Sequence, residues 1–343
     1  MASRSLCRVP IDCHTPGLKL RHERHGVTID HCMSWNVLVT RRIPPEGLEV
    51  LRSGAAKVDL HDDEAPLPRA DLLSRVGGCD GVMVTGGDRC DSEFFCAAPK
   101  LKVISCCAVG YDNVDLAEAT RRRIVVTNTP DVLTDAVADL TWALILSIAR
   151  RVIEGDRLAR SGEWRGWAPT QMRGADVAGK TIGIIGAGRI GTAVAKRAAG
   201  FSMRVFTVTR RSTRAELEAT LRQSDFVSVH VPLTPETRHL FGEAEFRTMK
   251  PTAYFINMAR GPVHDEAALV RALREGWIAG AGLDVYEHEP KISPELVRLP
   301  NTVLLPHLGS ATIETRRRMA ILAAENLLAV LNDRPCPNVV SRP

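Results

Sequence analysis

A glycine-rich turn, GAGRIG beginning at Gly186, constrains the fold of this chain more than any other feature. It follows the β-branched run TIGII and leads into GTAVAKRAAG, a segment typical of a helix. In a strand–turn–helix unit, Gly186 makes the tight turn, Gly188 lets a pyrophosphate approach the backbone, and Gly191 lets the helix pack on the strand. The helix N-terminus then presents free N–H groups to the phosphates, so Arg189 and Ile190 are also expected cofactor contacts. We predict a dinucleotide site here, against the alternative of an ordinary tight turn.

Short β-branched runs alternate with helical stretches along the chain from Trp35 onward. A first series ends at Asn128 and consists of NVLVT, KVDL, GVMVT, LKVISC and IVVTN. A second series begins at Thr181 and consists of TIGIIG, RVFTVT, DFVSVH, AYFINM, GAGLDV and TVLLP. Such alternation indicates parallel βαβ units. We therefore expect an α/β fold with two doubly wound parallel-sheet domains, the second of Rossmann type, and a functional site in the cleft between them.

The last long segment, TIETRRRMAILAAENLLAVL, is predicted to be a helix with Thr312 as its N-cap. Its apolar side chains fall on one face at helical spacing: Ile313, Ala320, Ala324, Leu327 and Leu331. Because the first domain lacks covering helices, we expect this helix to cross back to it. The predicted domains are a discontinuous one, 35–128 plus 308–343, and a second one, 129–307.

The first 34 residues contain three cysteines and four histidines but no clear periodicity. They lack the apolar centre of a signal peptide and contain acids that a transit peptide would avoid. We expect residues 1–34 to be a disordered tail, or sequence upstream of a true start at Met33. A Cys/His metal-binding tail is the alternative.

Composition argues against several classes of protein. The net charge is +5 and no run of basic residues is longer than three, so nucleic-acid binding is not expected. The longest apolar stretch, near LTWALILSIA, is too short to cross a membrane. The nine cysteines are odd in number and form no CxxC pair, which disfavours a disulfide framework or a zinc site. We expect a cytoplasmic protein without a metal, and no nucleic-acid or membrane partner.

The strand after the glycine-rich turn ends in the stretch RVFTVTRRST. An NAD site usually has an acid at this tip, where a carboxylate accepts hydrogen bonds from the ribose hydroxyls. Here the tip contains Thr209, Arg210 and Arg211, and arginine pairs with a 2′-phosphate. The sequence therefore favours NADP(H), with NAD(H) as the second possibility and Arg210 as the first candidate for the phosphate. The alternative to phosphate binding is that Arg210 and Arg211 are loop residues that contact only solvent.

Three further strands of the second series are followed by chemically active side chains. FINMARGP contains Arg260, GLDVYEHEP contains Asp284, Glu287 and Glu289, and LLPHLGSAT contains His307. Strand carboxyl ends are where doubly wound sheets bind their ligands. Each residue also has a purely structural alternative. Arg260 could be a surface charge, Glu289 a solvated acid in a turn, and His307 a cap at the end of a strand.

Together these segments resemble the D-isomer-specific 2-hydroxyacid dehydrogenases. The resemblance extends from Asn36 to Asn332 and includes AVGYDNVD, TNTPDVLTDAVAD, GAGRIG, PLTPETRHLF, NMARGP, GLDVYEHEP and PHLGSAT in this order. Within the family, VGYDNVD, SGEWRGW, ARGPV and HLGSAT are most similar to glyoxylate/hydroxypyruvate and 2-ketogluconate reductases. The resemblance implies a flavodoxin-like substrate domain ahead of the Rossmann-type cofactor domain.

The resemblance also implies roles for individual residues. Arg260, Glu289 and His307 match the family's catalytic Arg–Glu–His triad, in which the histidine donates the proton and the arginine holds the substrate. Backbone N–H groups would take the substrate carboxylate at Val109, Gly110 and Tyr111. Asp284 matches the residue that binds the nicotinamide amide, and further cofactor contacts are implied at Pro232, Thr237, Met258 and Gly309. A homodimer is implied, with Trp167 as a wall residue that reaches across the interface.

From these residues we expect an NADPH-preferring reductase of small 2-keto acids (glyoxylate, hydroxypyruvate or 2-ketogluconate) that makes D-2-hydroxy acids. One alternative is a non-catalytic, dinucleotide-sensing dimer like the corepressors that share the fold. Another is the oxidation of phosphite or a similar substrate on the same fold.

The chain departs from the family pattern at three places. The segment 212–224 is about ten residues short by comparison with the family, so one helix, AELEATLRQ, must connect the arginine tip to the next strand. Asp131 stands where the family often has glycine, and His264 where it often has valine. We keep His264, four residues after Arg260, as a weak candidate site residue.

Overall fold

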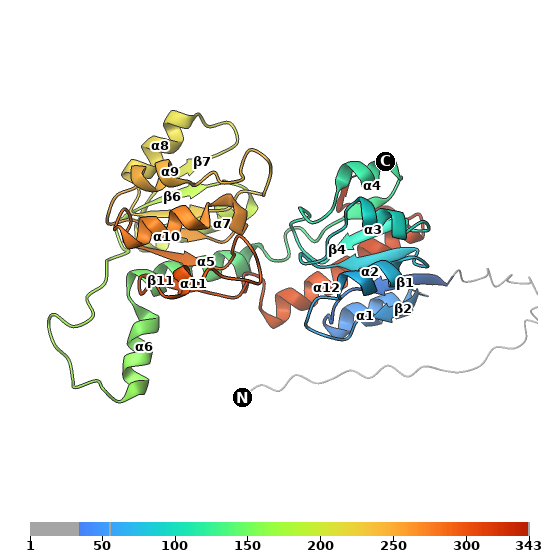
Figure 1. Ribbon diagram of the computed structural model, residues 1–343, viewed down its shortest axis with the longest axis horizontal. Helices are drawn as coiled ribbons and strands as arrows, with labels where there is room; N and C mark the ends of the chain where they lie inside the picture. Colours follow the sequence, from blue (N-terminus) through green and yellow to red (C-terminus); the bar gives the residue numbers. More distant parts are fainter. Residues whose placement is uncertain (1–33, 55, 342–343) are drawn as a thin grey trace, which may run out of the picture. The chain divides into compact units, whose positions relative to one another are not determined.

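The computed structural model describes residues 34–54 and 56–341. Two largely parallel sheets form its framework, and Figure 1 shows their strands and the helices around them. Apart from Ser34, the expected tail at 1–34, with its alternatives, lies outside the described residues.

The first sheet has the strand order β12-β5-β4-β3-β1-β2. Its parallel strands are β1 (Trp35–Val39), β2 (Ala56–Leu60), β3 (Gly81–Val84), β4 (Val103–Cys106) and β5 (Val125–Thr127). This order reverses at β1, which lies between β2 and β3, as in flavodoxin-like sheets. The short strand β12 (Val339–Ser341) adds to the edge antiparallel to β5 and has no counterpart among the predicted strands.

Helices cover both faces of the first sheet. One face packs on α1 (Pro45–Ser53) and α12 (Ile313–Leu331), through Val37 and Val39 on the strand side. The other face, which includes Leu38, packs on α2 (Arg69–Val76), α3 (Ser92–Ala97) and α4 (Leu116–Arg121). Successive side chains of a strand point to opposite faces of the sheet. Alternate residues of β1 therefore enter two different hydrophobic cores, as expected for a doubly wound sheet.

Helix α12 lies on the first sheet, as Figure 1 shows, although it follows the last strand of the second sheet in sequence. Thr312 caps it by accepting a hydrogen bond from the backbone N–H of Thr315. The prediction for Ile313 was wrong, because its side chain is 85% exposed. Ile313 occupies the first turn of α12, whereas the part of the helix that packs on the sheet begins at Ala320. The limits predicted for the two domains stay a prediction.

The second sheet is entirely parallel, with the order β11-β10-β9-β8-β6-β7. Its strands are β6 (Thr181–Ile185), β7 (Arg204–Val208), β8 (Phe226–Val229), β9 (Tyr254–Asn257), β10 (Gly280–Leu283) and β11 (Thr302–Leu304). The order reverses at β6, which lies between β7 and β8, so the loops after these strands flank a topological switch point.

The helices of the second sheet also divide between its two faces. The long apolar helix α5 (Thr134–Ala149) and α7 (Arg189–Ala198) pack on one face, where the Trp142 indole donates to the carbonyl of Val194. The other face packs on α8 (Arg214–Gln223), α9 (Glu243–Thr248) and α10 (Glu266–Arg274). Two further helices are α6 (Val152–Ser161) and α11 (Pro294–Val297). Within the described residues, no helix is both long and apolar enough to cross a membrane.

Candidate active site

The glycine-rich turn connects β6 to α7 with the geometry that its sequence predicts. Gly186 has a φ of +100°, and a Cβ there would lie 2.7 Å from the backbone carbonyl of His230. A Cβ at Gly191 would collide with the carbonyl oxygen of Gly186. At Gly188, by contrast, a Cβ would meet nothing within 4 Å, so the space before the N-terminus of α7 is open. Packing therefore requires two of the glycines, and the third leaves the backbone accessible to a phosphate.

The loop after β7 presents its arginines to solvent. Thr209, Arg210 and Arg211 are all exposed, and the Thr209 hydroxyl accepts a hydrogen bond from the backbone of Arg211. Within residues 34–54 and 56–341, neither Arg210 nor Arg211 forms an ion pair, whereas Arg214 in the first turn of α8 pairs with Glu245. Helix α8 follows at once, with a capping box of Thr213 and Glu216. Helix α8 alone thus connects the loop of Arg210 and Arg211 to β8, as the shortness of the segment 212–224 requires.

The remaining expected cofactor residues lie in the loops after β8, β9, β10 and β11. Pro232 and Thr237 share one loop, in which the Thr237 hydroxyl donates to the Pro232 carbonyl at 2.6 Å. Met258, Asp284 and Gly309 lie together: a Cβ on Gly309 would be 3.3 Å from an Asp284 oxygen and 3.7 Å from the Met258 methyl. The structure thus gathers these three residues from three different strand ends.

Asp284 is almost completely buried, with 1% exposure. Its two carboxylate oxygens accept the backbone N–H groups of Leu308 (2.6 Å) and Gly309 (2.8 Å). Burial nevertheless outweighs these bonds and raises the pKa of Asp284. The backbone carbonyl of Asp284 also accepts the N–H of His307, whose φ is +55°. Asp284 therefore fixes the backbone turn that carries His307, in addition to any contact with a cofactor.

The His307 ring and the Glu289 carboxylate form a hydrogen-bonded pair. Nδ1 of His307 lies 2.8 Å from Oε2 of Glu289, and the other oxygen of Glu289 accepts the backbone N–H of Tyr286. Burial raises the pKa of Glu289, but the hydrogen bond and charge of His307 outweigh it and hold this pKa below its usual range. The glutamate is therefore a carboxylate that orients the ring, and Nε2 is the ring atom left to face a ligand.

Arg260 extends from the loop after β9 to the loop after β4. Its Nε donates to Oδ1 of Asp112 at 2.9 Å, and its Nη1 donates to the carbonyl of Ala259 at 2.9 Å. Nη2 lies so close to Gly110 that a Cβ at this position would collide with it.

Arg260 also lowers the pKa of Glu289. The structure thus brings Arg260 to the expected carboxylate site at Val109, Gly110 and Tyr111, and within electrostatic range of the Glu289–His307 pair.

Asn257 and Asp112 are two site residues that the sequence reasoning did not identify. The Asn257 amide donates to the carbonyl of Arg260 and to Nδ1 of His264, both at 2.9 Å, and its oxygen accepts the N–H of Ala259. Burial lowers the pKa of His264 to about 4, so its ring is neutral and can accept this bond. His264 supports the loop of Arg260 through its hydrogen bond with Asn257. Its side chain is fully buried and so cannot contact a ligand. NMARGP contains Asn257, and AVGYDNVD contains Asp112, but neither motif signals these contacts.

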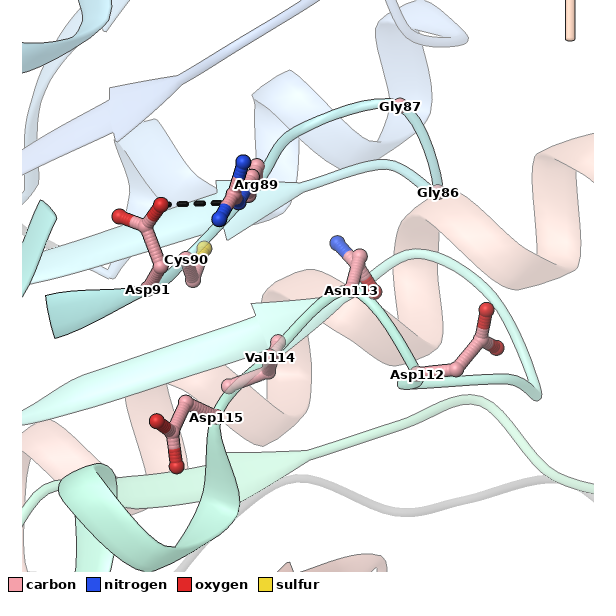
Figure 2. A pocket seen from close by; sticks show the side chains of 9 residues that line it. All are labelled: Gly86, Gly87, Arg89, Cys90, Asp91, Asp112, Asn113, Val114 and Asp115. Carbon is pink, nitrogen blue, oxygen red and sulfur yellow. Dashed lines mark ion pairs between the residues drawn. The ribbon is translucent and has the colours of Figure 1, made fainter. Parts of the chain in front are cut away.

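A pocket of ≈ 390 Å³ lies between the loops that follow β3 and β4. Figure 2 shows Gly86 and Gly87 on the first loop, and Asp112 and Asn113 on the second. The Asn113 amide connects the two loops by donating to the carbonyls of Thr85 and Asp88. Asp112 is therefore shared between the wall of this pocket and the contact with Arg260.

The backbone conformation of Asp131 explains why a glycine is also suited to this position. Asp131 has a φ of +69°, a backbone conformation that glycine adopts freely and that aspartate tolerates better than most residues. This conformation explains why a glycine suits the position. Asp131 also pairs with Arg189, one of the expected cofactor contacts, at 2.7 Å. Trp164 and Trp167 are 57% and 83% exposed in the single chain, and the wall position of Trp167 across a dimer interface stays a prediction.

Comparison with known proteins identifies the family of this chain. Residues 142–309 match the family model described as D-isomer specific 2-hydroxyacid dehydrogenase, NAD binding domain. The chain is 50% identical to a glyoxylate reductase from Thermococcus gammatolerans over 324 residues, which cover 90% of this chain and 97% of the relative. The crystal structure of the TT0316 protein from Thermus thermophilus superposes with a TM-score of 0.84 at 49% identity, covering 89% of this chain and 99% of that one.

A second solved structure is an NADPH-dependent glyoxylate/hydroxypyruvate reductase from Sinorhizobium meliloti in complex with NADP and malonate. It has a TM-score of 0.79 at 34% identity, and the match covers 89% of this chain and 96% of that one. The match to an NAD binding domain and the identity to glyoxylate reductases show that the chain is an oxidoreductase. The chain belongs to the D-isomer-specific 2-hydroxyacid dehydrogenase family and is an NAD(P)-dependent enzyme that acts on a hydroxyl donor.

Proposed function

We propose that this enzyme reduces small 2-keto acids, with glyoxylate first among them and hydroxypyruvate or 2-ketogluconate as further substrates, and that it prefers NADPH. The products are D-2-hydroxy acids wherever C2 becomes a stereocentre. One observation carries the proposal: the Glu289–His307 pair and Arg260 follow adjacent parallel strands of the sheet that also carries the dinucleotide turn. The names of the relatives, glyoxylate reductase and glyoxylate/hydroxypyruvate reductase, support this substrate class.

The residues of the chain suit the two ends of such a substrate. The keto acid's carboxylate would bind Arg260 and the backbone N–H groups at Val109, Gly110 and Tyr111, where Nη2 of Arg260 already lies against Gly110. The keto oxygen would accept a proton from Nε2 of His307, since Nδ1 is held by Glu289. The ionised Glu289 stabilises the positive charge of the ring before this transfer and fixes its orientation.

The nicotinamide cofactor, when bound, supplies the hydride for C2 of the keto acid. The open backbone at Gly188, ahead of the N-terminus of α7, suits its pyrophosphate. Asp284 and Gly309 would lie beside the nicotinamide, and Pro232 and Thr237 along the dinucleotide.

Turnover of keto acids tests the proposed reaction and the role of His307 together. The wild-type enzyme is expected to oxidise NADPH with glyoxylate, and kcat should fall by about 10²–10⁴-fold in His307→Ala, because a positioned general acid contributes this much. The measurement is a kcat/KM panel with glyoxylate, hydroxypyruvate and 2-ketogluconate. Absence of turnover with every keto acid, while dinucleotide still binds, would instead favour the non-catalytic sensing protein.

Cofactor preference depends on the arginines after β7. Both Arg210 and Arg211 are exposed and without ion-pair partners in the described part of the chain, which leaves them free for a 2′-phosphate. Arg210→Asp should shift the NADPH/NADH ratio of kcat/KM towards NADH by about 10–100-fold, because a hydrogen bond to a charged group contributes about 1.5–3 kcal/mol. Arg222→Asp, on α8 but paired with Glu218, is the matched control and should leave the ratio unchanged. An unchanged ratio in Arg210→Asp would assign the phosphate to another residue.

We also propose a homodimer that covers α6 and the loop after it. Helix α6 contains no buried residue, and the apolar side chains of Val152, Ile153, Trp164 and Trp167 are exposed within the single chain. Exposed apolar side chains gathered in one segment are typical of an interaction surface. Sedimentation equilibrium should give twice the chain mass of 37.5 kDa, and Trp167→Glu should shift the equilibrium towards the monomer. A monomeric wild-type protein at micromolar concentration would refute this assembly.

A cytoplasmic location completes the proposal. The six cysteines that the structure describes (Cys79, Cys90, Cys96, Cys106, Cys107 and Cys336) are all free thiols, as a reducing compartment requires.

A further inference from the structure

Asp112 contacts Arg260 from a loop that lies 148 residues away in sequence. Both side chains are partly exposed, Arg260 to 27% and Asp112 to 31%. An ion pair with this exposure contributes little to the stability of the fold. The contact therefore needs an explanation other than holding the fold together.

The neighbours of Asp112 have structural functions that Asp112 lacks. Asn113 connects the loops after β3 and β4, and Asp115 caps α4 by accepting the N–H of Glu118. In residues 34–54 and 56–341, the Asp112 side chain forms a hydrogen bond only with Arg260. Its carboxylate is thus directed at the guanidinium and at no backbone group of its own loop.

This contact determines which side of the guanidinium faces Gly110. An arginine has five N–H donors in a rigid plane, so fixing two of its nitrogens fixes the third. Asp112 holds Nε, and the carbonyl of Ala259 holds Nη1. Nη2 is then placed against the backbone of Gly110, where only glycine leaves room for it.

We propose that Asp112 is the positioning residue for Arg260, and that it acts through orientation rather than through its charge. The inference rests on the proposed function, in which Arg260 binds the carboxylate of a keto acid. Orientation and charge predict opposite effects here. A correctly oriented guanidinium binds the substrate anion better, whereas the negative charge of Asp112 alone would repel that anion.

Two substitutions separate these effects. Asp112→Ala removes the acceptor for Nε, so KM for glyoxylate and the inhibition constant of oxalate should both rise about tenfold or more, with kcat and KM for NADPH changed less than twofold. Asp112→Asn keeps an oxygen acceptor and removes the charge, so its KM for glyoxylate should be equal to or lower than that of the wild type. A KM in Asp112→Ala that is unchanged or lower would overturn the proposal, as would equal losses in the two variants.

A double-mutant cycle and a control complete the test. If Asp112 acts through Arg260, adding Asp112→Ala to Arg260→Ala should cause no further rise in KM, and additive effects would contradict the proposal. Asp265→Ala is the matched control, since Asp265 lies near Arg260 in sequence but caps α10 by accepting the N–H of Ala268. It should lower the midpoint temperature of thermal unfolding without changing KM for glyoxylate. If the wild-type enzyme reduces no keto acid, the proposed function is wrong. If it is active but Asp112→Ala leaves KM for glyoxylate unchanged, only the inference about Asp112 is wrong.

Discussion

The parallel pairing of β9, β10 and β11 is the constraint on which the site depends. In a parallel sheet all carboxyl ends lie at one edge, so the loops that carry Arg260, Glu289 and His307 come together although they are distant in sequence. The same edge receives the glycine-rich turn after β6 and the arginines after β7. The sheet thus brings the glycine-rich turn, Arg260 and the Glu289–His307 pair to one edge through its strand order alone.

Polar contacts then set the orientation of each group at this edge. Asp284 fixes the turn of His307 through backbone N–H groups, and Glu289 fixes its ring. Asn257, supported by a neutral His264, fixes the backbone of Arg260. Each functional side chain has its own supporting acceptor or donor, which is the arrangement that a preorganised site requires.

Much of this architecture could be predicted from the sequence, because it depends on periodicity and on motifs that are local. Every predicted strand is present, and the glycine-rich turn has the geometry that its three glycines imply. What could not be predicted depends on contacts between distant segments. The Asp112–Arg260 contact has no local pattern, β12 is too short to show a period, and the helical spacing of Ile313 could not reveal where α12 meets the sheet. The left-handed backbone of Asp131 likewise explains a departure that sequence alone left open.

The central claim is that this site transfers a hydride to C2 of a keto acid and a proton to its oxygen. Reduction of hydroxypyruvate with NADPH that carries deuterium at both C4 positions tests it most directly, with the product analysed by NMR and chiral chromatography. Hydride transfer to C2 should give D-glycerate with one deuterium at C2. Product without deuterium, or the L-isomer, would contradict it.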